Sequence, residues 1–280
     1  VQKLKSNNVL LSSANSINIG RLVPQIAYYF SAYCDLINAG EIKDGEKIDF
    51  VVPTGNFGNI LAGYYAKVMG LPVNRLVCAS NRNNVLTDFI TTGDYDINRE
   101  FFKTTSPSMD ILISSNLERL VFELSGRNAE LTKARMDSLK ATGRYNITAA
   151  ESEKMRESFA CGYADEKDVA QAISDMFDDY GYLIDTHTAA AYSVAERSEF
   201  LRPTVVVSTA NPFKFAPAVL DALGEDGDGE VDAKMLASLS DMTGMDAPQS
   251  LIGVFDAEVR FKDTVEPDKI LDAIAERYGK

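Results

Sequence analysis

The sequence predicts an α/β protein with an open, mostly parallel sheet and helices on both faces. Three short apolar runs have the length of strands, at residues 48–52, 75–79 and 204–207. They are continuous rather than alternating, which is typical of strands that are buried on both faces of a parallel sheet. Segments with helical spacing of apolar residues are interspersed among these runs, and such an alternation of strands and helices favours this fold class.

The expected helices have apolar residues three and four positions apart, and several of them end at a glycine. They span residues 20–39, 59–69, 85–92, 110–124, 188–198, 212–223 and 267–278. The segment 126–180 is rich in charge and alanine, and we expect a solvated helical insertion there, with several short helices and no strand. Val254 to Phe261 alternates apolar and polar residues, a pattern that predicts an edge strand.

The composition argues against several classes of function. With 28 basic and 41 acidic residues the net charge is −13, which repels nucleic acid and anionic membranes. No apolar run reaches membrane-spanning length. His187 is the only histidine, so we expect no metal site and no Ser-His-Asp triad. The three cysteines are far apart in the sequence, which suggests reduced thiols in the cytoplasm.

Each of the three predicted strands ends in a loop of small polar residues, around Gly55, Asn81 and Thr209. In open parallel sheets, ligands bind at the carboxyl ends of the strands. The sequence therefore predicts a ligand site that is formed by these three loops together.

The loop from Pro53 to Asn59 is the most informative of the three. It carries two glycines and leads into a helix N-terminus, where free backbone N–H groups and the helix dipole favour an anion such as phosphate. It has neither the Lys-Ser/Thr ending of a P-loop nor the glycine spacing of a dinucleotide-binding fold. The alternative is an ordinary turn between a strand and a helix, with an asparagine as the helix cap.

Two further polar clusters precede predicted helices, at residues 12–21 and 104–110. The first has five small polar side chains, whereas a helix cap needs only one. Surplus hydroxyls and amides at a helix N-terminus favour an anionic ligand, although loops are polar without a ligand about as often.

Taken together, these segments resemble the threonine synthase family. The resemblance rests on five motifs in the order in which that family has them: Ser-Ala-Asn-Ser-Ile-Asn-x-x-Arg (13–21), Pro-Thr-Gly-Asn-Phe-Gly-Asn (53–59), Pro-Ser-Met-Asp-Ile-Leu-Ile-Ser-Ser-Asn-Leu-Glu-Arg (107–119), Asp-Thr-His-Thr-Ala (185–189) and Ser-Thr-Ala-Asn-Pro-x-Lys-Phe (208–215). It implies the tryptophan synthase β-like fold of enzymes that depend on pyridoxal 5′-phosphate (PLP). It also implies a lyase of threonine biosynthesis, which converts O-phospho-L-homoserine and water to L-threonine and phosphate.

The resemblance assigns roles to particular residues. The backbone N–H groups of the phosphate loop would hold the 5′-phosphate of the cofactor, and the loop consists of Gly55, Asn56, Phe57, Gly58 and Asn59. The hydroxyl of Thr209 would meet the pyridine nitrogen and leave it largely unprotonated, which tunes the ring as an electron sink. The alternative for Thr209 is a hydroxyl that bonds to its own loop.

Other positions are candidates for the substrate side of the site. They are Ser13, Asn15, Ser16, Asn18 and Arg21. The guanidinium of Arg21 could meet a carboxylate or a phosphate bidentately, although an arginine in the first turn of a helix is often only a surface charge. His187 matches a family position, but Thr186 stands where the family usually has proline. We interpret His187 as a packing residue with no catalytic role.

The lysine that the family's chemistry requires is missing. In the family the Schiff-base lysine belongs to a Thr-x-x-Phe-Lys-Asp motif that precedes all the segments above. The Phe-Lys-Asp run at 261–263 is near the C-terminus, so we interpret Lys262 as a solvated charge on the predicted edge strand. We expect residues 1–280 to form most of the large PLP-binding domain, without the N-terminal region, the lysine segment and the small domain. Such a chain has no catalytic residue of its own and should be inactive alone.

Two other interpretations stay open at this point. The chain could belong to another PLP lyase of the same fold, similar to a dehydratase or a cysteine synthase, although these usually have a more glycine-rich phosphate loop. It could also be a non-catalytic module that binds a phosphorylated small molecule through the three strand-end loops, and the absent lysine favours this alternative.

Overall fold

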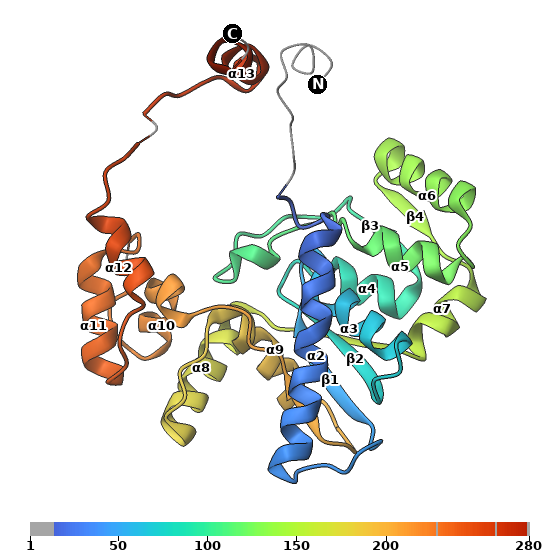
Figure 1. Cartoon of the computed structure of the whole chain (residues 1–280), viewed down its shortest axis with the longest axis horizontal. Coiled ribbons are helices and arrows are strands. Elements are labelled where there is room, and N and C mark those ends of the chain that lie inside the picture. Colours follow the sequence, from blue (N-terminus) through green and yellow to red (C-terminus); the bar gives the residue numbers. More distant parts are fainter. Residues whose placement is uncertain (1–13, 228, 261, 279–280) are drawn as a thin grey trace.

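A four-stranded parallel sheet forms the centre of the computed structural model, which describes residues 14–227, 229–260 and 262–278 (Figure 1). The strand order is β5-β2-β1-β6, and all three neighbouring pairs are parallel. These strands are β1 (Ile48–Pro53), β2 (Val73–Ser80), β5 (Phe159–Tyr163) and β6 (Thr204–Val206). The α/β class and the parallel sheet that the sequence predicts are confirmed.

The remaining elements surround this sheet. Two short strands pair antiparallel, β3 (Asp94–Asp96) and β4 (Arg144–Asn146). The α-helices of the described residues are α2 (Ile19–Ala39), α3 (Gly58–Val68), α4 (Val85–Thr92), α5 (Leu117–Leu124), α6 (Ala129–Thr142), α7 (Ala149–Arg156), α8 (Glu166–Tyr180), α9 (Thr186–Glu196), α10 (Ala216–Ala222), α11 (Ala233–Thr243), α12 (Gln249–Phe255) and α13 (Ile270–Tyr278). Short 3₁₀ helices are η1 (Pro107–Met109), η2 (Pro212–Phe215) and η3 (Pro267–Lys269).

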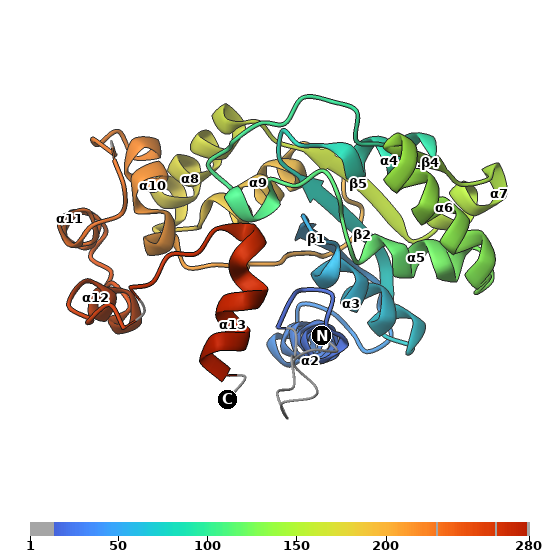
Figure 2. The same ribbon diagram turned by 90° about the horizontal axis from the view of Figure 1, so that it is seen from above.

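Helices cover both faces of the sheet because successive side chains of a strand point to opposite sides. Phe50 and Val52 of β1 belong to the large core that α2 and α3 close, where the ring of Tyr29 meets Phe50 edge-on at 4.9 Å between centroids. Val51 and Val77 face the other way and pack against α9. Figures 1 and 2 show α2 and α3 on one side of β1 and β2, with α9 on the other. Both surfaces of β1 are therefore buried, as its continuous apolar sequence predicts.

The predicted helix at 110–124 is only half correct. The helix begins at Leu117, and the residues before it form η1 and an irregular segment. Asp110 explains the difference, because its carboxylate accepts hydrogen bonds from the backbone N–H and the hydroxyl of Thr104 and from the amide of Asn83. These bonds tie Asp110 to a neighbouring loop instead of a helical turn.

The expectation of no strand between residues 126 and 180 is wrong. That segment contains β4 and also β5, which pairs with β2 at the edge of the main sheet. Strand β5 is short, and its sequence Phe-Ala-Cys-Gly-Tyr has no β-branched residue, so its strand signal is weak. Tertiary packing decides the outcome, because Gly162 lets the side chain of Val194 approach: a Cβ there would lie 2.8 Å from that valine.

The predicted edge strand from Val254 to Phe261 is also wrong. Helix α12 extends to Phe255, residues 256–260 are irregular, and Phe261 lies outside the described residues. Lys262 is exposed, as predicted, but it is not on a strand. Val254 and Phe255 complete α12 instead of starting a strand, and Figure 1 shows α12 and α13 apart from the main sheet. In the part of the chain that the structure describes, no helix is long and apolar enough to cross a membrane.

Candidate functional site

A cavity of about 570 Å³ opens at the carboxyl ends of β1 and β6. Two of the three predicted loops, those around Gly55 and Thr209, line it together with α2, η1 and the start of α9. Its lining residues are Ser16, Arg21, Gln25, Tyr28, Pro53, Thr54, Gly55, Asn56, Phe57, Gly58, Asn59, Ser108, Met109, His187, Val207, Ser208 and Thr209. The sequence-based prediction that the glycine loop and Thr209 meet at one mouth of the sheet agrees with this geometry.

The loop after β1 presents backbone N–H groups for which the described residues provide no acceptor. Phe57 adopts a left-handed conformation (φ 62°) and precedes α3 without giving it a side-chain cap. Among the described residues, none accepts a hydrogen bond from the N–H groups of residues 55–59. An uncapped helix N-terminus and a left-handed residue that aims N–H groups together make an anion-binding cup.

Two carbonyl groups of the same loop accept hydrogen bonds from the residues that precede α5. The Ser114 hydroxyl donates to the carbonyl of Gly55 at 2.8 Å. Asn116 donates to the carbonyl of Asn56 through its backbone N–H and its side chain, at 3.2 and 3.0 Å. With its carbonyls bound on the α5 side, the loop leaves its N–H groups for the opposite side.

Packing also fixes the conformation of the cup. Phe57 is 1% exposed, and its ring lies 5.6 Å from that of Phe159 on β5. A left-handed conformation is strained in a residue with a Cβ, and such strain persists only where surrounding contacts hold it. Strand β5, which the sequence did not predict, therefore helps to fix the conformation of the cup through the contact of Phe159 with Phe57.

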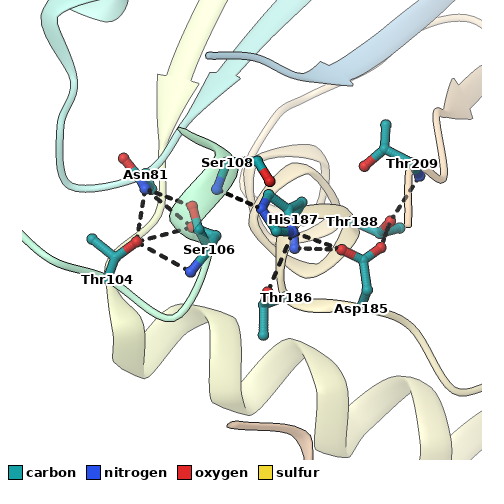
Figure 3. Close-up of polar contacts among 9 residues, drawn as sticks. All are labelled: Asn81, Thr104, Ser106, Ser108, Asp185, Thr186, His187, Thr188 and Thr209. Atoms are coloured by element: carbon teal, nitrogen blue, oxygen red, sulfur yellow. Dashed lines mark hydrogen bonds and ion pairs between the residues drawn. The ribbon is translucent and has the colours of Figure 1, made fainter. Parts of the chain in front are cut away.

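Thr209 lies on the opposite wall. Its backbone N–H donates to the Thr188 hydroxyl at 3.3 Å, and that hydroxyl in turn donates to the carboxylate of Asp185 (Figure 3). The Thr209 residue itself is exposed to the cavity. Its position is thus fixed through its main chain, not through its hydroxyl.

His187 is buried and fully bonded. Its Nε2 accepts from the backbone N–H of Ser108 at 3.1 Å, so the proton of the neutral ring lies on Nδ1, which donates to Asp185 at 2.9 Å. The ring also lies 4.7 Å from that of Phe215. These contacts fit the expected packing role, although one face of the residue lines the cavity.

Asp185 is fully buried, and burial alone would raise its pKa. Hydrogen bonds from His187 and Thr188 outweigh that effect and hold the pKa of this carboxyl below its usual value. Asp185 is therefore ionised at neutral pH and accepts bonds through both oxygens.

The predicted substrate residues separate into two groups. Ser16 and Arg21 line the cavity, and Arg21 is the one formally charged side chain among the described residues that do so. Asn15 and Asn18 serve the backbone, since Asn15 accepts from the N–H of Ile17 and Asn18 caps α2 by accepting from Gly20. Ser13 lies outside the described residues.

The segment that carries Ser16 and Arg21 is anchored to α5. The Asn116 side chain donates to the Ser16 carbonyl at 3.1 Å, and Arg119 donates to the Ile17 carbonyl at 2.8 Å. Asn116 therefore connects this segment with the phosphate loop, because it also bonds to Asn56.

The third predicted loop does not reach the cavity. Asn81 is buried, and its amide donates to Thr104, Ser106 and Asp110. It fixes the turn that carries Ser108 and Met109 to the cavity wall (Figure 3). The polar cluster at 104–110 is thus largely satisfied within the protein.

Sequence reasoning missed several lining residues. Gln25 and Tyr28 follow Arg21 by four and seven positions, so all three lie on one face of α2. Helical spacing from Arg21 could have identified them. Ser108 and Met109 belong to the polar cluster at 104–110 that the sequence analysis names, but their place on this wall depends on the tertiary fold that positions η1. Within the described residues, no lysine lines the cavity, and no group of three or more His, Cys, Asp or Glu side chains could hold a metal ion.

Comparisons with known proteins agree with these observations. A family model described as "Threonine synthase, C-terminal" matches residues 188–272. The chain is 46% identical over 216 residues to human "Threonine synthase-like 1", which covers 76% of this chain and 29% of that protein. It is 39% identical over 225 residues to a threonine synthase of Corynebacterium glutamicum, covering 77% of this chain and 45% of that one.

A solved structure gives the same result. PLP-bound threonine synthase from Brucella melitensis is 34% identical and matches with a TM-score of 0.81, over 100% of this chain and 57% of that one. The fold is therefore that of the tryptophan synthase β-like class of PLP enzymes. Within that class the chain resembles the C-terminal portion of threonine synthases. It spans 57% and 45% of the lengths of these two bacterial relatives, and 29% of the human one.

Proposed function

We propose that this chain is the cofactor-binding part of a PLP-dependent threonine synthase, a lyase that forms L-threonine and phosphate from O-phospho-L-homoserine and water. The observation that carries the proposal is the cup of N–H groups at residues 55–59, which faces Thr209 across one cavity. The similarity to threonine synthases supports the proposal. A cytoplasmic location fits the three free cysteines of the described residues.

The residues fit a phosphorylated cofactor. Gly55 is packed so closely that a Cβ would meet the Ser108 carbonyl oxygen at 2.7 Å, so the main chain itself forms the wall. The N–H groups of residues 55–59 lack protein acceptors among the described residues, and the dipole of α3 adds positive potential. A phosphate dianion would satisfy these donors and would be held locally within a protein of net charge −13.

When bound, PLP supplies an electron sink for carbanion chemistry at the substrate. The protein's part is to hold and orient it. The cup would bind the phosphate, and the Thr209 hydroxyl would meet the pyridine nitrogen and, as a neutral group, leave it unprotonated.

Substrate binding is proposed for the α2 side of the cavity. Arg21 and Ser16 lie there, and Arg21 would attract an anionic group of O-phospho-L-homoserine. Asn15, Asn18 and Ser13 are retained as weaker candidates, the first two as residues that shape the segment before α2.

The Schiff-base lysine is proposed to come from polypeptide outside these 280 residues. None of the described cavity residues is a lysine, and Lys214 lies near the Phe215 ring with its Nζ 5.5 Å from the centroid. The chain alone should bind the cofactor weakly and form no threonine.

The experiment compares the 280-residue chain with the complete gene product. We expect threonine from O-phospho-L-homoserine only with the complete protein, and PLP binding without a Schiff-base absorbance band in the chain alone. Threonine formation by the isolated chain would overturn the assignment of the lysine.

The same assay also tests turnover of serine, because the chain is 46% identical to a protein named only as threonine synthase-like. If the complete protein consumes serine but not O-phospho-L-homoserine, a dehydratase-like lyase replaces the proposal. If it binds PLP but turns over neither substrate, a non-catalytic module is the better description.

A further inference from the structure

Asp185 makes more contacts than a helix cap requires. Its Oδ1 accepts from the backbone N–H of His187 and from Nδ1 of the same residue, both at 2.9 Å, and its Oδ2 accepts from the Thr188 hydroxyl. Within the described part of the chain, Asp165, the cap of α8, accepts only from the backbone N–H groups of Lys167 and Asp168. The carboxylate of Asp185 thus binds two neighbouring side chains, and each of them continues to the cavity (Figure 3).

One branch leads to the wall that carries Thr209. The Thr188 hydroxyl gives its proton to Asp185, so its oxygen is free to accept the backbone N–H of Thr209. The main chain of Thr209 has no regular strand around it, since β6 ends at Val206. This bond therefore fixes where the Thr209 hydroxyl can lie.

The other branch leads to the wall behind the phosphate loop. Because Asp185 holds the proton of His187 on Nδ1, Nε2 must accept, and it takes the backbone N–H of Ser108 at 3.1 Å. The Ser108 carbonyl in turn lies against Gly55. Without Asp185 the ring could turn or change tautomer, and the Ser108 N–H would lose its acceptor.

We propose that Asp185 is a positioning residue that sets the separation of the two cavity walls, holding Thr209 through Thr188 and Ser108 through His187. The inference rests on the proposed function, in which the phosphate of PLP binds at the wall with the cup and its pyridine nitrogen meets the wall with Thr209. A rigid ligand that contacts both walls requires their separation to be correct, whereas inorganic phosphate contacts only the cup. A low pKa of Asp185 is consistent with this role, because the ionised carboxyl is the form that accepts all three bonds.

The first measurement is amide hydrogen exchange of the 280-residue chain without ligand. Thr188→Val keeps the side-chain volume and should make the Thr209 amide exchange about tenfold faster, with the Ser108 amide unchanged. His187→Phe keeps a ring against Phe215 and should accelerate Ser108 alone. Asp185→Ala should accelerate both amides.

Matched controls separate positioning from stability. Asp165→Ala removes the cap of α8, which is not one of the residues that line the cavity, and Thr132→Val removes a buried hydroxyl that donates to the carbonyl of Asn128. Neither should change exchange at Ser108 or Thr209. The inference is overturned if Asp185→Ala accelerates neither amide, or if it accelerates exchange throughout the core, as a general loss of stability would.

The second measurement is calorimetric titration of the same variants with PLP and with inorganic phosphate. Thr188→Val should weaken PLP binding about tenfold and change phosphate binding less than twofold, and Thr188→Ser should restore PLP binding. Wild-type chain that binds no PLP would overturn the proposed function, and the exchange pattern would still decide whether Asp185 holds both walls. Wild-type chain that binds PLP no better than Thr188→Val would overturn the inference alone.

Discussion

The carbonyl oxygen of Ser108 lies so close to Gly55 that a Cβ at Gly55 would meet it at 2.7 Å. Ser108 lies in η1, after β3, and Gly55 follows β1, so two separate segments meet at the phosphate cup. A side chain at Gly55 would have to displace main chain, which cannot rotate away as a flexible side chain can.

Gly55→Ala should therefore damage the cup. We expect PLP and inorganic phosphate both to bind at least about tenfold more weakly, and the free energy of unfolding to fall by about 1–3 kcal/mol from overpacking. Calorimetric titration and urea unfolding measure the two effects. Gly253→Ala is the control, because a Cβ at Gly253 has nothing within 4 Å. Unchanged phosphate binding in Gly55→Ala would place the anion elsewhere.

The Thr209 hydroxyl should contribute to binding of the pyridine ring of PLP and not to binding of its phosphate. Its hydroxyl makes no hydrogen bond among the described residues, so Thr209→Val should leave the free energy of unfolding within about 0.5 kcal/mol. PLP binding should weaken by roughly threefold to tenfold, the worth of one hydrogen bond. Phosphate binding should stay the same, and Thr209→Ser should bind PLP like the wild type. An equal loss for both ligands would contradict the assignment to the pyridine nitrogen.

The sequence was sufficient for much of the sheet and for the phosphate loop. The runs at 48–52 and 75–79 are apolar segments of β-propensity that form largely buried strands, so local pattern and tertiary burial agree there. The run at 204–207 forms β6 as well, but its residues are only half-buried at the edge of the sheet. The loop at 53–59 combines glycine with a helix start, and both features are local. Where the local sequence pattern and the tertiary fold favour the same structure, a single sequence is sufficient to predict that structure.

The failures have a common physical cause. Strand β5 is short and lacks β-branched residues, and it forms because Phe159 and Gly162 fit their neighbours. Asn81 is at a strand end, as predicted, yet its amide bonds to a loop more than twenty residues later instead of a ligand. Such pairings depend on distant partners, and no local pattern contains them.

The buried ion pair of Arg135 and Glu151 predicts an acid-sensitive stability. Two parallel hydrogen bonds join the groups, at 2.9 and 2.6 Å, and Glu151 also accepts from Thr148 in a capping box. The bond from Arg135 is the main reason that the pKa of Glu151 falls from 4.5 to about 2. A lowered pKa in the folded state means stabilisation that is complete above about 4.5 and is lost as the pH falls through about 2.

Glu151→Gln should test this. At pH 7 the variant should lose about 3 kcal/mol of unfolding free energy, because Arg135 is left buried without its partner charge. The difference from the wild type should shrink between about pH 5 and pH 2, as measured by urea unfolding at several pH values. Glu153→Gln is the control, because Glu153 lies on the same helix and forms no ion pair among the described residues. A difference that is constant with pH would exclude the ion pair as its source.

The C-terminal segment should contribute little to the stability of the fold. None of the α13 residues is buried, and Ile270 and Leu271 are 50% and 44% exposed. Deleting residues 257–280 should therefore change the unfolding free energy by less than about 0.5 kcal/mol and leave the urea slope the same. Leu239→Ala on α11 should cost about 2–5 kcal/mol instead, because that side chain is fully buried. A loss above about 1 kcal/mol on truncation would show that α13 packs against the body of the protein in solution.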